Sequence, residues 1–203
     1  MSIDHVNVHY YEAAVLCCPS APPTCTPTLD DYHQAAWRVF AGTTHYSVGQ
    51  RLFVFSFESL TPEQHLLIVR SSMEFPHAQK RHITLRQGDN IRLEWSWVPS
   101  IATRLSPTGE RLPRSKHIPA PREQWEALLC QRLGNHGFSA VPTALRCTPL
   151  GQWPMNAQRS RWCQRVHVQA DLHIEDAQKA AQAWLSGVSR LKAYGMGMLC
   201  CRK

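Results

Sequence analysis

Hydrophobic and polar residues follow regular periods along most of this 203-residue chain. Alternation with a period of two predicts half-buried strands, and recurrence about every 3.6 residues predicts amphipathic helices. Strands are expected at 1–11, 51–58, 65–71, 82–85, 90–98, 161–174 (as one long or two paired strands) and 195–201. Helices are expected at 29–40, 122–133 and 177–188, and a basic connection at 104–117.

Capping residues support two of the helix starts. Thr28 precedes the first helix and is followed three residues later by Asp31, close to a capping box. Asp176 stands in the same position before the last helix. Pro121 and Gly134 suit the start and the end of the helix between them.

The order of elements predicts an α+β fold. Strand, helix, two strands, helix and strand form the ferredoxin-like plan, which fits both halves of the chain, although no internal sequence repeat shows the duplication. We therefore expect tandem ferredoxin-like (RRM-like) domains with antiparallel sheets, at residues 1–88 and 89–203. The first copy lacks a clear second helix.

Composition favours an anionic partner. The net charge is +7, and nucleic acid is the commonest such partner, although a basic protein without a specific partner is the alternative. The N-terminus has no signal-peptide pattern and no apolar run reaches the ~20 residues of a membrane span, so a cytoplasmic protein that is not bound to a membrane is expected. Zinc is disfavoured because Cys17, Cys18 and Cys25 form no Cys-x-x-Cys pair. We expect no metal and no cofactor.

The segment from 187 to 197 is rich in glycine and contains two cations. Glycine lets a backbone approach phosphates closely, and nearby cations complete an anion site. Glycine spacing alone favours the simpler interpretation, an ordinary turn with a glycine cap. The candidate phosphate-binding residues of this segment are Gly187, Ser189, Arg190, Lys192, Gly195 and Gly197.

This segment resembles the motif GxGxxKxxGxGLL of the Cas-six superfamily of CRISPR RNA endonucleases. The second glycine of that motif is Ser189 here. Other stretches are similar to the CasE branch of the superfamily and follow in its order: 33–40, 51–58, 65–72, 92–99, 107–113, 125–133 and 165–175.

The resemblance implies an endoribonuclease that cuts CRISPR precursor RNA at the 3′ base of the repeat stem-loop without a metal. It implies a 2′,3′-cyclic phosphate product, continued binding to the hairpin, and other Cas proteins of a type I-E or type IV effector complex as partners. The catalytic histidine of the branch falls on His33, in the first helix. The tyrosine that often stands three residues earlier is Asp30 here, and the neighbouring Tyr32 lies on the apolar face, where core packing is expected.

Elementary chemistry also favours His33. Attack of a 2′-hydroxyl on its own phosphodiester needs a group that takes one proton and a group that gives another, and histidine titrates near neutrality. Lys192 and Arg190 are the cations expected to stabilise the transition state. Arg38 lies about 140° around the helix from His33, so backbone binding or solvation is expected there.

Further cations are candidates for contact with the RNA backbone, because a double-stranded stem is read mainly by shape and charge. They are Arg104, Arg111, Arg114, Lys116, Arg159 and Arg161, with Arg122 and Arg165 nearby. The alternating aromatics of 53–57 and 95–97 are expected in the core. A non-catalytic subunit that only holds an RNA hairpin, and an RRM-like protein for single strands, remain alternative functions.

Overall fold

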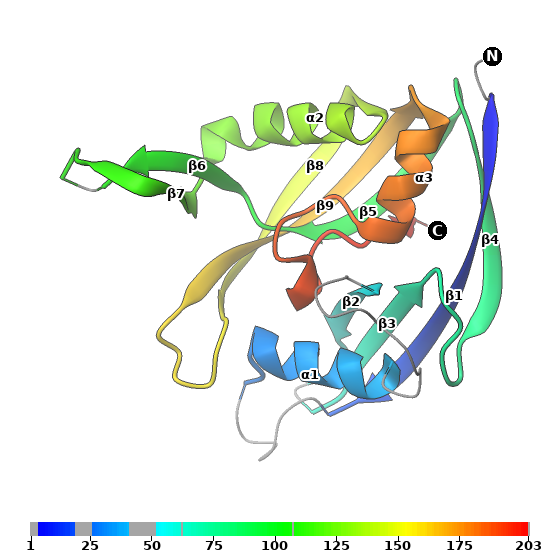
Figure 1. Ribbon diagram of the computed structural model, residues 1–203, viewed down its shortest axis with the longest axis horizontal. Coiled ribbons are helices and arrows are strands. Elements are labelled where there is room, and N and C mark those ends of the chain that lie inside the picture. The colour runs from blue at the N-terminus through cyan, green and yellow to red at the C-terminus, as the bar shows by residue number, and fades with distance from the viewer. Residues whose placement is uncertain (1–3, 19–25, 41–51, 62, 107, 203) are drawn as a thin grey trace.

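The computed structural model describes residues 4–18, 26–40, 52–61, 63–106, 108–202 of the chain. The described residues form two four-stranded antiparallel sheets and a separate two-stranded hairpin (Figure 1). Cys25, one of the three cysteines considered for a zinc site, lies outside the described residues.

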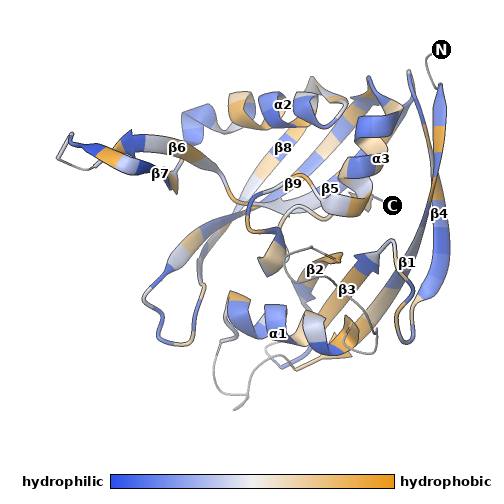
Figure 2. Cartoon of the chain, in the orientation of Figure 1, coloured by the Kyte–Doolittle hydropathy of each residue, from blue (hydrophilic) through white to orange (hydrophobic). Residues whose placement is uncertain are grey.

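The first sheet has the strand order β2-β3-β1-β4. The long strand β1 pairs with β3 through its second half and with β4 through its first half. Figure 2 shows that β2 and β3 are mostly hydrophobic whereas the edge strand β4 is mostly hydrophilic, as expected for a strand with little buried surface. The elements of this part are β1 (His5–Cys17), α1 (Leu29–Phe40), β2 (Phe53–Ser59), β3 (His65–Ser71) and β4 (Gln79–Arg86).

The second sheet has the order β10-β5-β9-β8, and a β-hairpin is inserted after its first strand. With α2 and α3 as its two crossovers, this is the complete strand–helix–strand–strand–helix–strand arrangement expected from the sequence. Its strands are β5 (Asn90–Trp97), β8 (Phe138–Pro154), β9 (Trp162–Ile174) and β10 (Cys200–Cys201). Its other elements are β6 (Ser100–Leu105), β7 (Arg111–Pro119), η1 (Arg122–Gln124), α2 (Trp125–Asn135), α3 (Ala177–Ser186) and η2 (Lys192–Tyr194).

Both predicted helix caps are confirmed. The Thr28 backbone N–H donates to the Asp31 carboxylate at 2.7 Å, and the Asp31 N–H donates back to the Thr28 hydroxyl at 3.3 Å. The Asp176 carboxylate accepts from the Lys179 N–H at 3.0 Å. Reciprocal bonds of this kind satisfy backbone groups that have no partner within the helix, so the position of the first helix along the chain is fixed locally.

Helix α3 covers part of the first sheet, which has no second helix of its own. It contacts β1, β2 and β4 of that sheet in addition to belonging to the second unit. Trp184 of α3 meets Tyr10 of β1 edge to face at 5.9 Å between ring centroids. One helix therefore covers apolar surface from both halves of the chain.

Arg70 of β3 joins the two halves from inside. It donates to the Glu12 carboxylate at 2.8 Å and to the Leu199 carbonyl at 2.8 Å, and its guanidinium lies 4.0 Å from the Trp184 ring centroid. Arg70 is only 3% exposed. A buried charge requires this full set of partners, so β3 is tied to the segment that leads into β10.

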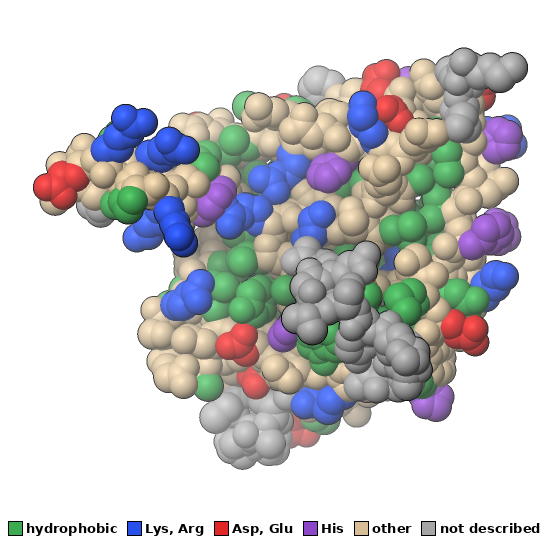
Figure 3. All heavy atoms as spheres, in the orientation of Figure 1, with side chains coloured by type: hydrophobic (Ala, Val, Ile, Leu, Met, Phe, Trp, Pro, Cys, Tyr) green, Lys and Arg blue, Asp and Glu red, His purple; other side chains and the backbone are tan. Residues whose placement is uncertain are grey.

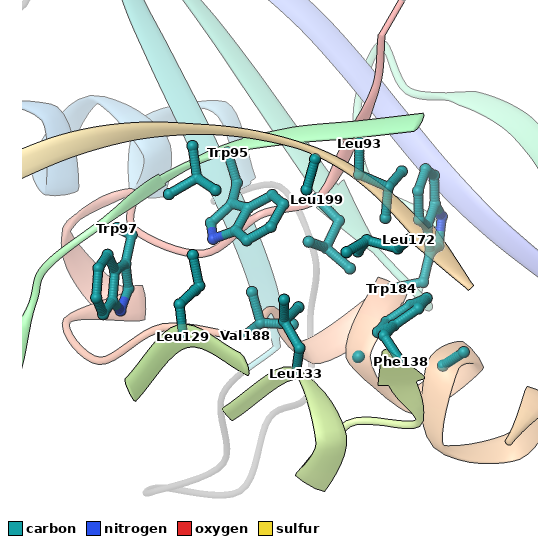
Figure 4. Packing of buried hydrophobic residues seen from close by; sticks show 14 of the residues in the cluster. Leu93, Trp95, Trp97, Leu129, Leu133, Phe138, Leu172, Trp184, Val188 and Leu199 are labelled. Carbon is teal, nitrogen blue, oxygen red and sulfur yellow. The ribbon is translucent and has the colours of Figure 1, made fainter. Parts of the chain in front are cut away.

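Two hydrophobic clusters form the core, and both take residues from either side of position 88. Figure 4 shows Trp95 and Leu93 of β5 facing Leu129 and Leu133 of α2 across one of them. The aromatics Phe53, Phe55, Phe57, Trp95 and Trp97 are all buried, which confirms core packing for them. Whether 1–88 and 89–203 are domains that fold separately stays a prediction.

Several predicted boundaries are wrong. Strand β8 was not expected, because two prolines and a glycine interrupt its pattern; it pairs with β9 through two register shifts. The basic connection proves to be the hairpin β6–β7. The last strand is only Cys200–Cys201, since 195–199 is irregular, and the helix expected at 122–133 begins with the 3-10 turn η1.

Candidate nucleic-acid cleavage site

His33 lies on α1 with its ring half-buried against the C-terminal turn. Its Nδ1 is 2.6 Å from the carbonyl oxygen of Ala193, in η2. This short turn, red in Figure 1, contacts both α1 and β2. The His33 ring is therefore on the side of the helix that faces residues 187–197, where a cationic partner was expected.

The hydrogen bonds of His33 define the tautomer of its neutral ring. The Trp37 indole N–H donates to His33 Nε2 at 3.2 Å, and an indole nitrogen cannot accept. Nε2 therefore carries a lone pair, and Nδ1 carries the proton that is donated to Ala193. In this tautomer Nε2 is the nitrogen that can accept a proton.

The glycines of the C-terminal turn are used for close packing of backbone on backbone. Gly197 has φ +90°, its N–H donates to the Ser96 carbonyl at 2.7 Å, and a side chain there would clash with Ser189. Gly187 has φ +74°, and an added Cβ would meet the Gly197 carbonyl at 2.8 Å. Gly195 packs against the rings of Phe55 and Phe57. These glycines and Ser189 are buried, so they shape the turn from inside.

Cations surround this turn. Lys192 is half-buried at the start of η2, and Arg190, two residues earlier, is half-buried as well. Arg190 Nη1 is buried without a hydrogen-bond partner among the described residues. Burial lowers the pKa of His136, and the positive charges of Lys192 and Arg132 lower it further. Positive groups from α2 and from the turn thus face one another, which favours an anion.

Tyr194 and Asp30 complete the surroundings of His33. The ring centroids of Tyr194 and His33 are 5.7 Å apart. The Asp30 carboxylate and the Arg161 side chain are both close enough to act on the Tyr194 phenol. Burial raises the pKa of Tyr194, the Asp30 charge raises it further, and the Arg161 charge opposes this rise. Sequence reasoning noted Asp30 as a departure but missed Tyr194, whose only signal was its place between Lys192 and Gly195.

The β8–β9 connection docks at the start of α1. The Asp30 N–H donates to the Met155 carbonyl at 3.0 Å, and Arg159 donates to the Thr26 carbonyl at 3.2 Å. This docking brings Arg161 to the His33 site. Arg38 is exposed and lies near Cys17. Burial raises the pKa of the Cys17 thiol, and the charge of Arg38 opposes this rise. Arg38 therefore belongs to another part of the surface.

The remaining predicted cations lie on the hairpin, away from His33. All four are exposed, and Figure 3 shows Lys and Arg side chains on this projecting hairpin and on the surface between α2 and α1. The four are Arg104 on β6 and Arg111, Arg114 and Lys116 on β7.

Arg165 was expected near the exposed cations that would bind RNA, and the structure shows instead that it is buried. It is 7% exposed, donates to the Ser96 hydroxyl and the Phe57 carbonyl at 2.9 Å each, and lies 4.1 Å from the Phe57 ring centroid. Burial lowers its pKa to about 10. Because its donors are used inside the protein, Arg165 joins the two sheets and does not belong with the exposed Arg159 and Arg161. Tyr32 is fully buried and shares a hydrogen bond with His65 Nδ1, as a core residue.

Two further observations concern the described residues alone. No three His, Cys, Asp or Glu side chains in the described part of the chain come together as a possible metal site. Among the same residues, no helix has the length and apolar character needed to cross a membrane.

Solved structures with this fold come from CRISPR systems. A Thermus thermophilus Cse3 bound to an RNA representing a pre-cleavage complex has a TM-score of 0.70 at 19% identity, covering 97% of this chain and 100% of that chain. Cas6e from Escherichia coli K-12 has a TM-score of 0.66 at 17% identity, covering 95% and 97%. A chain of a CRISPR RNA-guided surveillance complex gives 0.56 at 19% identity, covering 94% and 97%. These likenesses confirm the expected two-part fold.

No curated protein sequence matches the chain. A family model described as CRISPR associated protein matches residues 23–203, which is nearly the whole chain. The match includes α1 with His33 and the complete C-terminal turn, the two segments that form the candidate site. The protein therefore belongs to the CRISPR associated protein family and has the fold of its CasE-type members.

Proposed function

We propose that this protein is a metal-independent endoribonuclease that cuts CRISPR precursor RNA at the 3′ base of the repeat stem-loop. The observation that carries the proposal is the placement of His33, a proton-transfer group, against the cationic turn that contains Lys192. Three solved structures with the same fold are those of Cse3 with bound RNA, and two of them are described as a CRISPR endoribonuclease. The likeness supports an RNA substrate of the same class.

The chemistry follows from the groups present. The 2′-hydroxyl before the cut attacks its own phosphodiester and leaves a 2′,3′-cyclic phosphate, while the 5′-oxygen of the next nucleotide departs. His33 takes part in proton transfer. Lys192 and Arg190 stabilise the charge that develops on the phosphate oxygens, where fixed cations are most effective. No water is consumed in this step.

Binding is proposed to use charge over a wide surface. The exposed cations of the β6–β7 hairpin, with Arg159 and Arg161 near the His33 site, would follow the phosphates of the stem. The buried residues Gly187, Ser189, Gly195 and Gly197 would act on RNA only through the shape of the turn that they hold. The protein would remain on the hairpin and join other Cas proteins in a type I-E or type IV effector complex.

A cleavage assay tests this function. An end-labelled repeat hairpin is incubated with the protein in EDTA, beside the same RNA with a single 2′-deoxy nucleotide before the cut. We expect the first RNA to be cut to a cyclic phosphate and the second to stay intact. Tight binding of the unmodified hairpin without any cleavage would instead support the non-catalytic RNA-holding subunit. Preference for an unstructured oligomer would support the single-strand binder.

A further inference from the structure

The phenol of Tyr194 occupies the space beside His33 and is the feature of the site that the proposed function leaves unused. Tyr194 comes from η2, whereas His33 and Asp30 come from α1. All three side chains are partly exposed, so the group is open to a ligand. We propose that Tyr194 is a second catalytic residue, which donates a proton to the leaving 5′-oxygen while His33 accepts the proton of the 2′-hydroxyl. This inference rests on the proposed endoribonuclease function.

The hydrogen bonds of His33 show why a second group is needed. Its Nδ1 proton is held by the Ala193 carbonyl at 2.6 Å, so only Nε2 can exchange a proton with a substrate. The neutral ring has no proton at Nε2, as the bond from Trp37 shows. His33 in this state can act as a base and has no proton to give to the leaving oxygen. The second proton transfer requires another donor.

The surroundings of Tyr194 suit a proton donor. Its ring centroid lies 5.7 Å from that of His33, and the Asp30 carboxylate is close enough to act on its hydroxyl. Asp30 is held in turn, because its backbone N–H donates to the Met155 carbonyl. The charged groups that face the phenol are Asp30 and Arg161, and the His33 ring is its neighbour.

The protonation state of the phenol agrees with this role. Burial and the Asp30 carboxylate raise the pKa of Tyr194, so the hydroxyl keeps its proton at neutral pH. A departing alkoxide is a much stronger base than a phenolate, so the transfer is favourable once the bond to phosphorus begins to break. Arg161 lies close enough to stabilise the phenolate that remains, since its charge acts to lower the pKa.

The proposed step balances. The 2′-oxygen forms a bond to phosphorus as its proton passes to His33 Nε2, which releases its hydrogen bond from Trp37. The bond between phosphorus and the 5′-oxygen breaks, the electron pair leaves with that oxygen, and the Tyr194 proton neutralises it. The products are a cyclic phosphate and a free 5′-hydroxyl. The proton on His33 then returns to the phenolate through water.

Tyr194→Phe tests the proposal, because it keeps the ring beside His33 and removes only the hydroxyl. In single-turnover cleavage of the repeat hairpin, we expect a rate lower by ~10²–10⁴-fold, the usual contribution of a proton-transfer group, with unchanged RNA affinity. The same assay is run on RNA whose leaving 5′-oxygen is replaced by sulfur, since a thiolate departs without protonation. On this RNA, Tyr194→Phe should cut as fast as the unmodified protein.

Two controls separate the roles. His33→Asn should be slow on both RNAs, because a missing base is not replaced by a better leaving group. Lys192→Met should also be slow on both. Rescue of Lys192→Met by the sulfur substrate, without rescue of Tyr194→Phe, would overturn the proposal and assign the proton to the ammonium group.

The dependence of the cleavage rate on pH tests independently whether His33 is the base or the acid. With His33 as the base, the rate of the unmodified protein should rise through the range where histidine titrates and then stay level to about pH 9. A rate that falls over that range would identify His33 as the acid and overturn the role of Tyr194. Unchanged cleavage of ordinary RNA by Tyr194→Phe would overturn that role alone. An unmodified protein that cuts neither RNA would contradict the proposed function itself.

Discussion

Replacing His33 with Asn separates what the histidine does for the fold from what it does for cleavage. The amide nitrogen of Asn can reach nearly the position of His33 Nδ1, so it can still donate to the Ala193 carbonyl. It cannot replace Nε2 as a proton acceptor. His33→Ala removes both functions, which makes the two variants a matched pair.

The structure sets the size of both effects. His33→Ala leaves the Ala193 carbonyl without its donor, which costs about 1–3 kcal/mol of unfolding free energy, and the lower end applies because water can reach this half-buried position. A domain with a total of roughly 5–15 kcal/mol remains folded. Cleavage should fall by ~10²–10⁴-fold in both variants, equivalent to about 2.7–5.4 kcal/mol of transition-state stabilisation.

The assay has three readouts on the same protein samples. Urea unfolding should place His33→Ala below His33→Asn, because both variants lose the acceptor of the Trp37 N–H and only His33→Ala also loses the donor to the Ala193 carbonyl. Fluorescence anisotropy should give all three proteins a similar affinity for the hairpin. Single-turnover cleavage in EDTA should be lost in both variants. If His33→Asn cuts within about tenfold of the unmodified protein, less than the smallest loss expected for a proton-transfer group, the reasoning is refuted.

The remaining predictions concern two residues that stabilise the fold around the site and one cation of the site. Arg70→Met should lower the unfolding free energy by about 3 kcal/mol in urea titrations, because it leaves Glu12, which is 19% exposed, without its buried partner; a change below about 1 kcal/mol would contradict this. Gly197→Ala should cost roughly 2–4 kcal/mol through its positive φ and its clash with Ser189, and a variant as stable as the unmodified protein would disprove that packing. Lys192→Ala should weaken hairpin binding and reduce the slope of log affinity against log salt by about 1, measured by anisotropy; an unchanged slope would show that Lys192 meets no phosphate.

Local signals in the sequence were sufficient for much of the fold. The Thr28–Asp31 capping box fixed the start of α1, and alternation of aromatic residues located β2 and β5, because these patterns depend on neighbours in the chain. Strand β8 was missed for a physical reason: it has prolines and a glycine, and its pairing depends on the register shifts that its partner β9 accepts. The β6–β7 hairpin was missed because its exposed residues leave almost no hydrophobic pattern.

By itself, the sequence determined the ferredoxin-like order of elements, the position of His33 on a helix, and the cationic glycine-rich turn near the C-terminus. Only the tertiary structure decided that this turn lies on the His33 ring, that Tyr194 stands beside it, and that Arg165 is buried while Arg161 is exposed. The physical reason is distance along the chain. A cap or a strand pattern is set by residues a few positions apart, whereas the contact between His33 and Ala193 spans 160 positions and exists only because two sheets and a shared helix pack together.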